Sequence, residues 1–369
     1  MAFQASRALF EQRKRPCALS CIAVSHDGRF FAYCPQTSKV LVSEYKDGEF
    51  RLVKELAQHD QLVTSIEFAP SSYNLLTCSQ DRNAYVWDFG KDNEWNPTLV
   101  HLRIHRAATY CKWSWDGKKF AVCSGQKCIS VCYYEEENNW WVSKLIEDFD
   151  STVSCVCWHK SNTYLAAGSM DGAVRLFTAA VKGVDDKPTQ LFGPDVSFKK
   201  IGQMICKIET NSWVHDICFS PTFDSIAFVT HDSSISFLPI QEGVIPQQEQ
   251  LERIRCSGLP HLRMMFLSHN RVLAAGHDCN PTVYAKEGKG WKTKNVQSKI
   301  SPVSPPSAMK KRNQLRNLLL QKSVEDSLHY KQIKAKVEES KVAEGFIEDA
   351  KFAVQDVDPE VCHFAMTTL

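Results

Sequence analysis

Short apolar runs separated by polar turns recur at a nearly constant interval along this chain. Six runs of five residues end in small or hydroxyl side chains, and the first four begin 45 residues apart. Apolar runs of this length between turn residues are typical of buried β-strands. The pattern therefore predicts six equivalent strands, at Phe30–Cys34, Leu75–Ser79, Phe120–Ser124, Leu165–Ser169, Ile226–Thr230 and Val272–Gly276.

Each of these runs has an apolar partner before it and another after it. The preceding strands are expected at Ser20–Val24, Val63–Phe68, Thr109–Trp113, Val153–Trp158, Val214–Phe219 and Leu262–Leu267. The following strands are expected at Val40–Tyr45, Ala84–Trp87, Cys128–Tyr133, Ala173–Phe177, Ser234–Leu238 and Pro281–Tyr284. An antiparallel unit repeated about every 45 residues is typical of a β-propeller blade.

A fourth, outer strand of each unit is less marked. The clearest outer strands are predicted at Leu52–Leu56, Thr98–Leu102 and Trp140–Leu145. The fourth and fifth repeats are separated by 61 residues instead of 45, and the extra length contains the Gly- and charge-rich segment Val181–Gly202. This segment is expected to form a surface loop between strands of the fourth blade.

The second unit carries the Trp-Asp pair of a WD repeat, in the stretch Asp81-Arg82-Asn83-Ala84-Tyr85-Val86-Trp87-Asp88. A buried Trp N–H and a His need hydrogen-bond partners, which a turn carboxylate and a hydroxyl supply. The spacing predicts a structural tetrad of His59, Asp81, Trp87 and a hydroxyl, with Ser79 favoured and Thr77 as the alternative. Asp171, His231-Asp232 and His277-Asp278 occupy the matching turns, so the same structural role is expected for them.

Length and charge fit this architecture. Seven blades of about 45 residues need roughly 315 residues, so 369 residues accommodate one propeller and an insertion. The net charge of +2 gives no global field for nucleic acid. No run is long enough to span a membrane, and residues 1–14 lack the apolar core of a signal peptide.

The candidate chemistry is sparse. Fifteen cysteines include no Cys-x-x-Cys pair, and Cys34, Cys78 and Cys123 fall in apolar strands, which predicts buried free thiols in a reducing, cytosolic compartment. There is no Gly-rich phosphate loop. His101 and His105 follow a predicted strand and do not share a helical face for a metal. No catalytic residue, cofactor or metal is expected.

The composition changes after Val296. A Pro- and Ser-rich linker at Ser298–Ser307 precedes a short basic amphipathic helix, which carries Lys310, Lys311, Arg312, Leu315, Arg316, Leu318 and Leu319. Such a helix either binds a partner or packs on its own propeller. The expected domains are six blades in residues 1–296, a helical insertion in 297–328 and an incomplete seventh blade in 329–369. Ala5–Glu11 is a candidate outer strand for that last blade, and its missing third strand predicts lower stability.

With the blades placed, the chain resembles the WD-repeat subunit of the actin-related protein 2/3 complex, which nucleates branched actin filaments. The motifs that carry the resemblance run collinearly from about residue 20 to 285. They include Asp81–Trp87, Ile129–Glu135 with Trp140-Trp141-Val142, Trp213-Val214-His215 and Ala274–Cys279.

The resemblance implies a seven-bladed, non-enzymatic scaffold in the cytoplasm and cortical actin cytoskeleton. The implied partners are the other subunits, the actin filament, touched by the helix of the insertion, and nucleation-promoting factors. The alternative is a generic WD-repeat adaptor, for example in ubiquitin ligation or trafficking. A propeller hydrolase is disfavoured, because the acidic and His residues fall in inter-strand turns instead of converging on the channel mouth.

Overall fold

The computed structural model describes residues 18–294, apart from residues 187, 189, 195, 257, 279, 280 and 289. Within these residues the chain forms six antiparallel sheets of four strands each, with one short 3-10 helix at Gln248–Gln250. The prediction of an all-β fold is confirmed. The predicted insertion and the incomplete seventh blade lie outside the described residues.

The first three sheets follow one another along the chain. Blade one contains β1 (Cys21–Val24), β2 (Phe30–Cys34), β3 (Val40–Lys46) and β4 (Glu49–Leu56). Blade two contains β5 (Val63–Phe68), β6 (Leu75–Ser79), β7 (Ala84–Phe89) and β8 (Trp95–Val100). Blade three contains β9 (Ala108–Trp113), β10 (Lys119–Ser124), β11 (Cys128–Glu135) and β12 (Trp140–Ile146).

The last three sheets repeat this order. Blade four contains β13 (Val153–Trp158), β14 (Tyr164–Ser169), β15 (Ala173–Thr178) and β16 (Met204–Glu209). Blade five contains β17 (Val214–Phe219), β18 (Ser225–Thr230), β19 (Ser234–Pro239) and β20 (Glu252–Arg255). Blade six contains β21 (His261–Ser268), β22 (Arg271–Gly276), β23 (Thr282–Glu287) and β24 (Gly290–Lys294).

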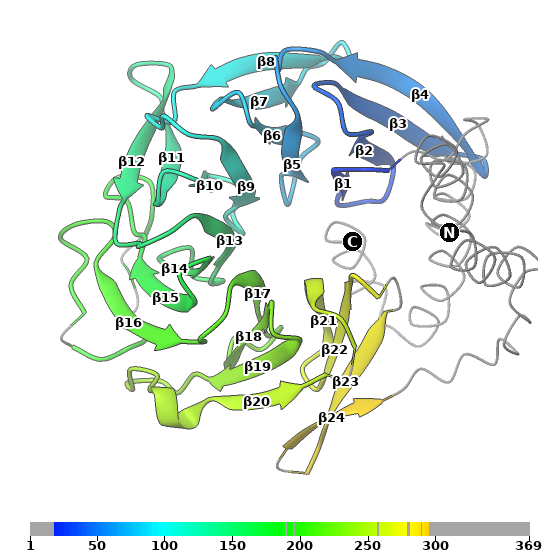
Figure 1. The fold of residues 1–369 in the computed structure, drawn as a ribbon. Coiled ribbons are helices and arrows are strands. Elements are labelled where there is room, and N and C mark those ends of the chain that lie inside the picture. Colours follow the sequence, from blue (N-terminus) through cyan, green and yellow to red (C-terminus); the bar gives the residue numbers. More distant parts are fainter. Residues whose placement is uncertain are drawn as a thin grey trace, which may run out of the picture.

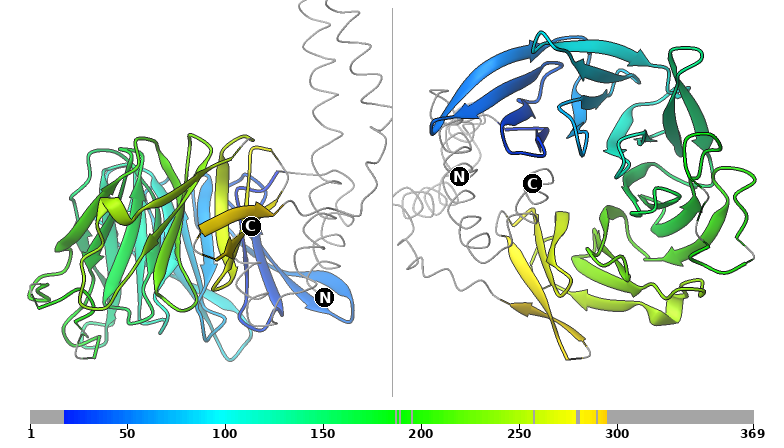
Figure 2. Two further views of the ribbon diagram at one scale, coloured as in Figure 1. Left: turned by 90° about the horizontal axis from the view of Figure 1, so that it is seen from below. Right: turned by 180° about the vertical axis from the view of Figure 1, so that it is seen from behind.

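The sheets are arranged around a common centre, as Figure 1 shows, with the first strand of each sheet innermost. Along the chain, each of the inner strands β1, β5, β9, β13, β17 and β21 contacts the next. The side view in Figure 2 shows the blades standing next to one another in one layer. This is the radial arrangement of a β-propeller, in which every blade packs against its neighbours in sequence.

The predicted first, second and third strands are all present, with ends shifted by three residues at most. The outer strands differ more, because they are half-exposed and their pattern is weak. β8 begins at Trp95, three residues before the predicted strand, since the Trp95 ring packs on Phe30 of blade one and its Nε1 donates to the Tyr73 carbonyl oxygen at 2.9 Å. β16, β20 and β24 were not predicted.

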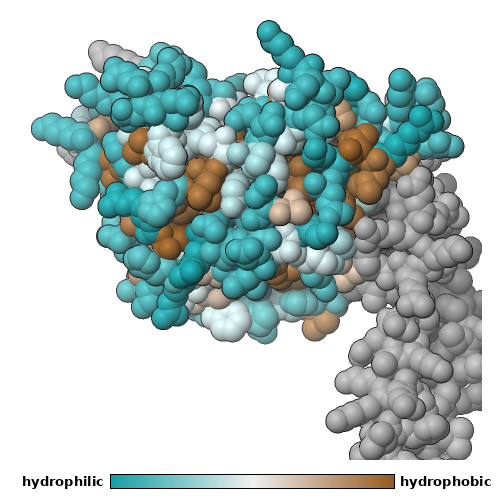
Figure 3. Space-filling view, turned by 90° about the horizontal axis from the view of Figure 1, so that it is seen from above, coloured by the Kyte–Doolittle hydropathy of each residue, from teal (hydrophilic) through white to brown (hydrophobic). Residues whose placement is uncertain are grey.

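The core lies between adjacent blades instead of inside one layer. Alternate residues of each strand face opposite neighbours, so Phe30 and Val42 of blade one pack with Leu75 and Trp87 of blade two in one cluster. Cys34, Cys78 and Cys123 are buried free thiols, as predicted. The exposed large apolar side chains are scattered, and Figure 3 shows apolar patches separated by polar surface on one side of the molecule.

Candidate functional site

The tetrad of blade two is assembled around the hydroxyl of Thr77. Trp87 Nε1 donates to Thr77 Oγ1 at 3.0 Å, and Thr77 Oγ1 lies 2.8 Å from His59 Nε2. His59 Nδ1 lies 2.8 Å from Asp81 Oδ2. Because indole nitrogen only donates and carboxylate only accepts, Trp87 donates to Thr77 and His59 donates its Nδ1–H to Asp81; the tautomer that carries its proton on Nδ1 then accepts the Thr77 hydroxyl at Nε2.

Ser79, which the sequence favoured as the hydroxyl of the tetrad, is not a member of it. Its hydroxyl donates to the Gln61 carbonyl oxygen at 3.0 Å and accepts from the Asp81 backbone N–H at 3.2 Å. Leu75, Thr77 and Ser79 share one face of β6, and Leu75 is the residue opposite Trp87 in the β6–β7 register, so Thr77 is the diagonal neighbour of the Trp87 indole and Ser79 lies one alternate position farther along the strand. Ser79 instead anchors the turn that presents Asp81.

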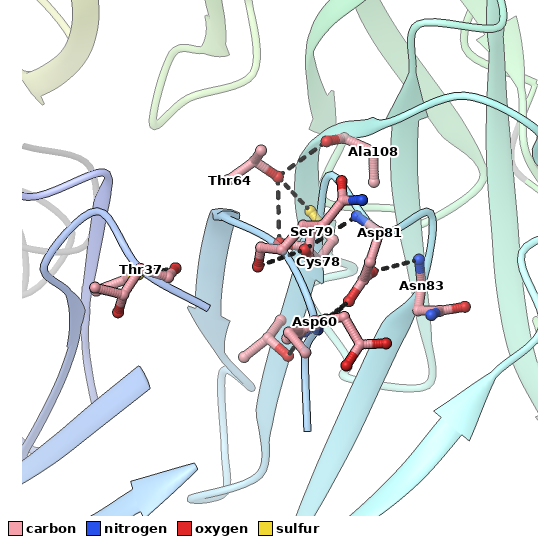
Figure 4. A network of polar contacts seen from close by, with 12 residues as sticks. Thr37, Asp60, Thr64, Cys78, Ser79, Asp81, Asn83 and Ala108 are labelled. Carbon is pink, nitrogen blue, oxygen red and sulfur yellow. Dashed lines mark hydrogen bonds and ion pairs between the residues drawn. The ribbon is translucent and has the colours of Figure 1, made fainter. Parts of the chain in front are cut away.

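Asp81 also ties the loop before β5 to the turn after β6. Its carboxylate accepts the backbone N–H of Asp60 at 3.0 Å and of Asn83 at 2.9 Å, and Figure 4 shows both directed toward it. Burial would raise the pKa of Asp81, but the hydrogen bonds from His59 and from these backbone groups outweigh it and hold the pKa below its usual value. The ionised carboxylate is therefore part of the fold.

The matching turns of other blades repeat this backbone contact with different side chains. Asp171 accepts the Asp150 N–H at 3.0 Å, and Asp278 accepts the Leu259 N–H at 2.6 Å. Asp171 also pairs with Arg175 at 2.8 Å. Asp232 accepts from Thr230 at 2.5 Å and pairs with Arg253. These carboxylates connect strands within their own blades.

His231 pairs with another histidine and not with Asp232, the aspartate that follows it. His231 Nδ1 lies 2.9 Å from His215 Nε2, and its ring lies 6.5 Å from that of His277. Burial, together with these neighbouring histidines, lowers the pKa of His215 to about 4. Within the described residues no group of His, Cys, Asp or Glu side chains is arranged to hold a metal ion.

A ladder of hydroxyls between blades was missed from the sequence. In blades one to four, one hydroxyl residue at the inner strand donates to the first carbonyl of the next inner strand: Ser20 to Val63 (2.8 Å), Thr64 to Ala108 (3.0 Å), Thr109 to Val153 (2.6 Å) and Ser154 to Val214 (2.5 Å). The step from Thr64 to Ala108 is visible in Figure 4. The recurrence of Ser or Thr every 44 or 45 residues is a signal that could have found it.

Partly buried charges occupy the centre of the ring. Lys112 Nζ of β9 pairs with Glu67 Oε1 of β5 at 2.5 Å. The Arg263 guanidinium of β21 lies 5.1 Å from the centre of the Tyr110 ring of β9, and it donates to the His215 carbonyl oxygen at 3.2 Å. These side chains belong to blades two, three, five and six, so they connect blades that are distant in sequence.

Two further sequence expectations concern the basic helix and membrane spans. Lys310, Lys311, Arg312, Leu315, Arg316, Leu318 and Leu319 of the predicted helix lie outside the described residues. Among the residues that are described, no helix is long and apolar enough to cross a membrane.

Comparison with known proteins agrees with the blade geometry. The family model described as "WD domain, G-beta repeat" matches residues 50–88 and 143–178. Each match runs from the outer strand of one sheet through the third strand of the next, here β4–β7 and β12–β15. Together with the Trp87-centred tetrad, these matches define the class of the protein, a WD-repeat β-propeller.

Relatives extend the match well beyond the repeat. "Actin-related protein 2/3 complex subunit 1A-B" of Xenopus laevis is 40% identical over 276 residues, covering 74% of this chain and 72% of the relative. "Actin-related protein 2/3 complex subunit 1" of Saccharomyces cerevisiae is 34% identical over 287 residues, covering 77% and 72%. "Actin-related protein 2/3 complex subunit 1B-A" of Xenopus laevis is 35% identical over 360 residues, 95% of both chains. The chain belongs to the actin-related protein 2/3 complex subunit 1 family.

Proposed function

We propose that this chain is the WD-repeat subunit of an actin-related protein 2/3 complex and acts there as a non-catalytic scaffold. In this role it holds other subunits on the faces of the propeller and supports the nucleation of branched actin filaments. The site of action is the cytoplasm, at the cortical actin cytoskeleton. The observation that carries the proposal is the collinear identity of 34–40% to subunits of that name across about three quarters of the chain.

The arrangement of polar groups supports a scaffold over an enzyme. The His and Asp residues of blade two are committed to hydrogen bonds that fasten strands and turns. The charged residues at the ring centre are likewise engaged with one another or with backbone carbonyls. Catalysis requires a nucleophile, base or stabilising donor directed at an open reaction site, and these groups point to partners within the fold.

The proposed contact with actin is made by the basic helix of the insertion. Lys310, Lys311 and Arg316 supply positive charge, and Leu315, Leu318 and Leu319 recur at helical spacing to give an apolar face. An amphipathic helix of this kind can lie with its apolar face in a groove of a partner. Nucleation-promoting factors are proposed to act on the assembled complex.

Purification of the tagged chain from its own cells tests the assembly. The expected result is co-purification, in stoichiometric amounts, of two actin-related proteins and several small subunits. Recovery of ubiquitin-ligase or trafficking components in their place would overturn the proposal and favour the general WD-repeat adaptor.

Charge reversal of the helix tests the contact with actin. We expect K310E/K311E/R316E to leave co-purification intact and to reduce branch formation in an actin polymerisation assay, because the salt-sensitive attraction to the filament is lost. The matched control is K46E/K118E/K160E, which makes the same charge change at three exposed lysines of the described propeller. If both variants form branches to the same extent, the proposed contact between the helix and actin is wrong.

A further inference from the structure

Blade one contains a pair of cysteines placed directly across two strands. Cys21 of β1 is opposite Cys34 of β2 in the antiparallel register. Directly opposed residues of such strands have Cα atoms about 4.5–5.5 Å apart, which lies within the range that a disulfide bridges. Both thiols are free in the structure.

The two thiols interact with each other and differ in acidity. The interaction between the two side chains is the largest cause that raises the pKa of Cys21 and the largest that lowers the pKa of Cys34, to about 5. When protonated, Cys34 Sγ can donate to the Thr37 carbonyl oxygen, 3.0 Å away. One sulfur is therefore readily ionised, while its neighbour keeps a proton.

One member of the pair, Cys21, borders open space. A cavity at the centre of the ring is lined by Ser20 and Cys21 of blade one together with Thr64, Tyr110, Lys112 and Arg263 of other blades. Cys21 is only partly buried, whereas Cys34 is fully buried behind it. A small polar molecule in this cavity meets Cys21 first and reaches Cys34 only past it, and a large reagent is kept from Cys34.

We propose that Cys21 and Cys34 form a peroxide-sensitive thiol pair, which hydrogen peroxide converts into a disulfide across β1 and β2. The Cys34 sulfur bonds to one peroxide oxygen, the O–O bond breaks, and the other oxygen leaves as water, so that Cys34 becomes a sulfenic acid. The Cys21 sulfur then attacks the Cys34 sulfur. The S–O bond breaks, the S–S bond forms, and a second water leaves with the Cys21 proton.

This chemistry balances without another reactant. Two thiols lose two electrons and two protons, and one hydrogen peroxide becomes two waters. A sulfenic acid beside a resolving thiol is the usual route to a protein disulfide. Thiol reductants reverse the reaction by thiol–disulfide exchange.

In the other described blades no cysteine is opposite another across the first two strands. Cys78 is opposite Ser65, and Cys123 is opposite Tyr110. Burial raises the pKa of Cys123 well above its usual range, and it raises that of Cys132 to about 12. These buried thiols are therefore expected to resist peroxide, since the thiolate is the reactive form.

Peptide mapping of the full-length chain tests the proposal. The reduced protein is treated with hydrogen peroxide at pH 7, unfolded, alkylated and digested with trypsin, which separates Cys21 from Cys34 by cleaving after Arg29. All samples carry C17S, because Cys17 shares a peptide with Cys21. We expect alkylation of Cys21 and Cys34 to be lost together, at least about tenfold faster than that of Cys123, with a linked peptide that dithiothreitol removes.

Variants separate the roles of the two thiols. C34S is expected to keep Cys21 alkylated, while C21S allows Cys34 to oxidise further to the sulfinic acid. The matched control C123S should leave the linked peptide unchanged. Alkylation of Cys21 and Cys34 that persists like that of Cys123 and Cys132, or equal loss at all four, would overturn the proposal, and this comparison holds in the C17S protein even if a variant fails to fold.

Discussion

At the scale of single residues, the tetrad explains why His59 and Asp81 are not free to act as an acid and a base. Within the tetrad, the side chain of each residue is hydrogen-bonded to that of the next, from the Trp87 indole to the Asp81 carboxylate. Such a network stabilises a fold only when every member is satisfied. Its central member is Thr77, which both accepts and donates.

Replacing Thr77 by valine should therefore cost more than the loss of one hydrogen bond. T77V leaves the Trp87 N–H and the His59 Nε2 without their partner in a buried site, so we expect a loss of about 2–4 kcal/mol in the free energy of unfolding. Urea denaturation measures the loss. In a W87F background the cost of T77V should be smaller, and equal costs in both backgrounds would contradict the shared hydroxyl.

His159 predicts a pH dependence of stability. Burial lowers its pKa to about 4, its ring contacts Phe223, and its Nδ1 accepts the Ser161 N–H at 3.1 Å. In the unfolded chain His159 takes up a proton near pH 6.5, whereas in the folded protein it stays neutral until the pH nears 4. The contribution of the neutral, buried His159 to the free energy of unfolding is therefore complete above pH 6.5 and is lost as the pH falls toward 4. The melting temperature should fall between pH 6.5 and 5, and less steeply for H159Q. If the melting temperature falls with pH equally in the wild type and in H159Q, the pH dependence does not come from His159.

At the scale of strands and loops, the sequence was most informative where an element is buried on both sides. The second strands β2, β6, β10 and β14 are fully buried, and their apolar runs located them almost to the residue. The outer strand β16 has one buried residue among six, so no apolar run marks it. It forms because β15 offers unpaired backbone groups along its free edge.

The loop between β15 and β16 is held by a buried lysine of another blade. Lys119 Nζ is 2.5 Å from Asp185 Oδ2 and donates to the carbonyl oxygens of Asn162 (2.7 Å) and Ala179 (3.0 Å). Asp185 in turn accepts the Val181 N–H at 2.6 Å. The loop predicted at Val181–Gly202 thus begins with an anchor that the sequence did not reveal.

Removing this lysine should loosen the loop. K119M leaves the Asp185 carboxylate buried without its counter-ion, which costs about 3 kcal/mol or more, so amides of residues 179–186 should exchange faster with deuterium. K119M/D185N removes the charge and retains an acceptor for the Val181 N–H, and it should recover part of the loss. If the double variant is no more stable than K119M, the unpaired charge of Asp185 does not cause the loss of stability.

At the scale of the whole molecule, the blades are joined in two ways. Adjacent blades share apolar clusters and the hydroxyl ladder, whereas the charged side chains at the centre join blade six to blades three and five. The Asp216 carboxylate lies buried beside this centre and accepts the Met264 N–H of β21 at 2.8 Å. Burial raises the pKa of Asp216, and the Arg263 charge opposes that rise.

Replacement of Arg263 should weaken the whole ring in a pH-dependent way. In R263Q the pKa of Asp216 in the folded protein rises further. The contribution of Asp216 to the free energy of unfolding is then complete below its pKa in the unfolded chain, about 3.9, and is lost as the pH rises through its pKa in the folded protein. Chemical denaturation should show R263Q falling behind the wild type by about 3 kcal/mol at neutral pH, and by less at lower pH. D216N/R263Q should remove this difference in slope, and a pH-independent deficit in R263Q would argue against the effect of the Arg263 charge on Asp216.

The sequence by itself determined the number and order of the described blades, because burial between neighbouring sheets imposes an apolar run at every repeat. It also located the turn of Asp81 and the indole of Trp87, since these depend on local spacing. Only the tertiary structure decided which hydroxyl joins them, that Lys119 reaches Asp185, and that Arg263 meets Tyr110 and Cys21 faces Cys34. Those partners are set by register and by the closing of one blade on another, and these particular contacts, unlike the hydroxyl ladder, do not recur with the repeat, so they leave no periodic trace in the order of amino acids.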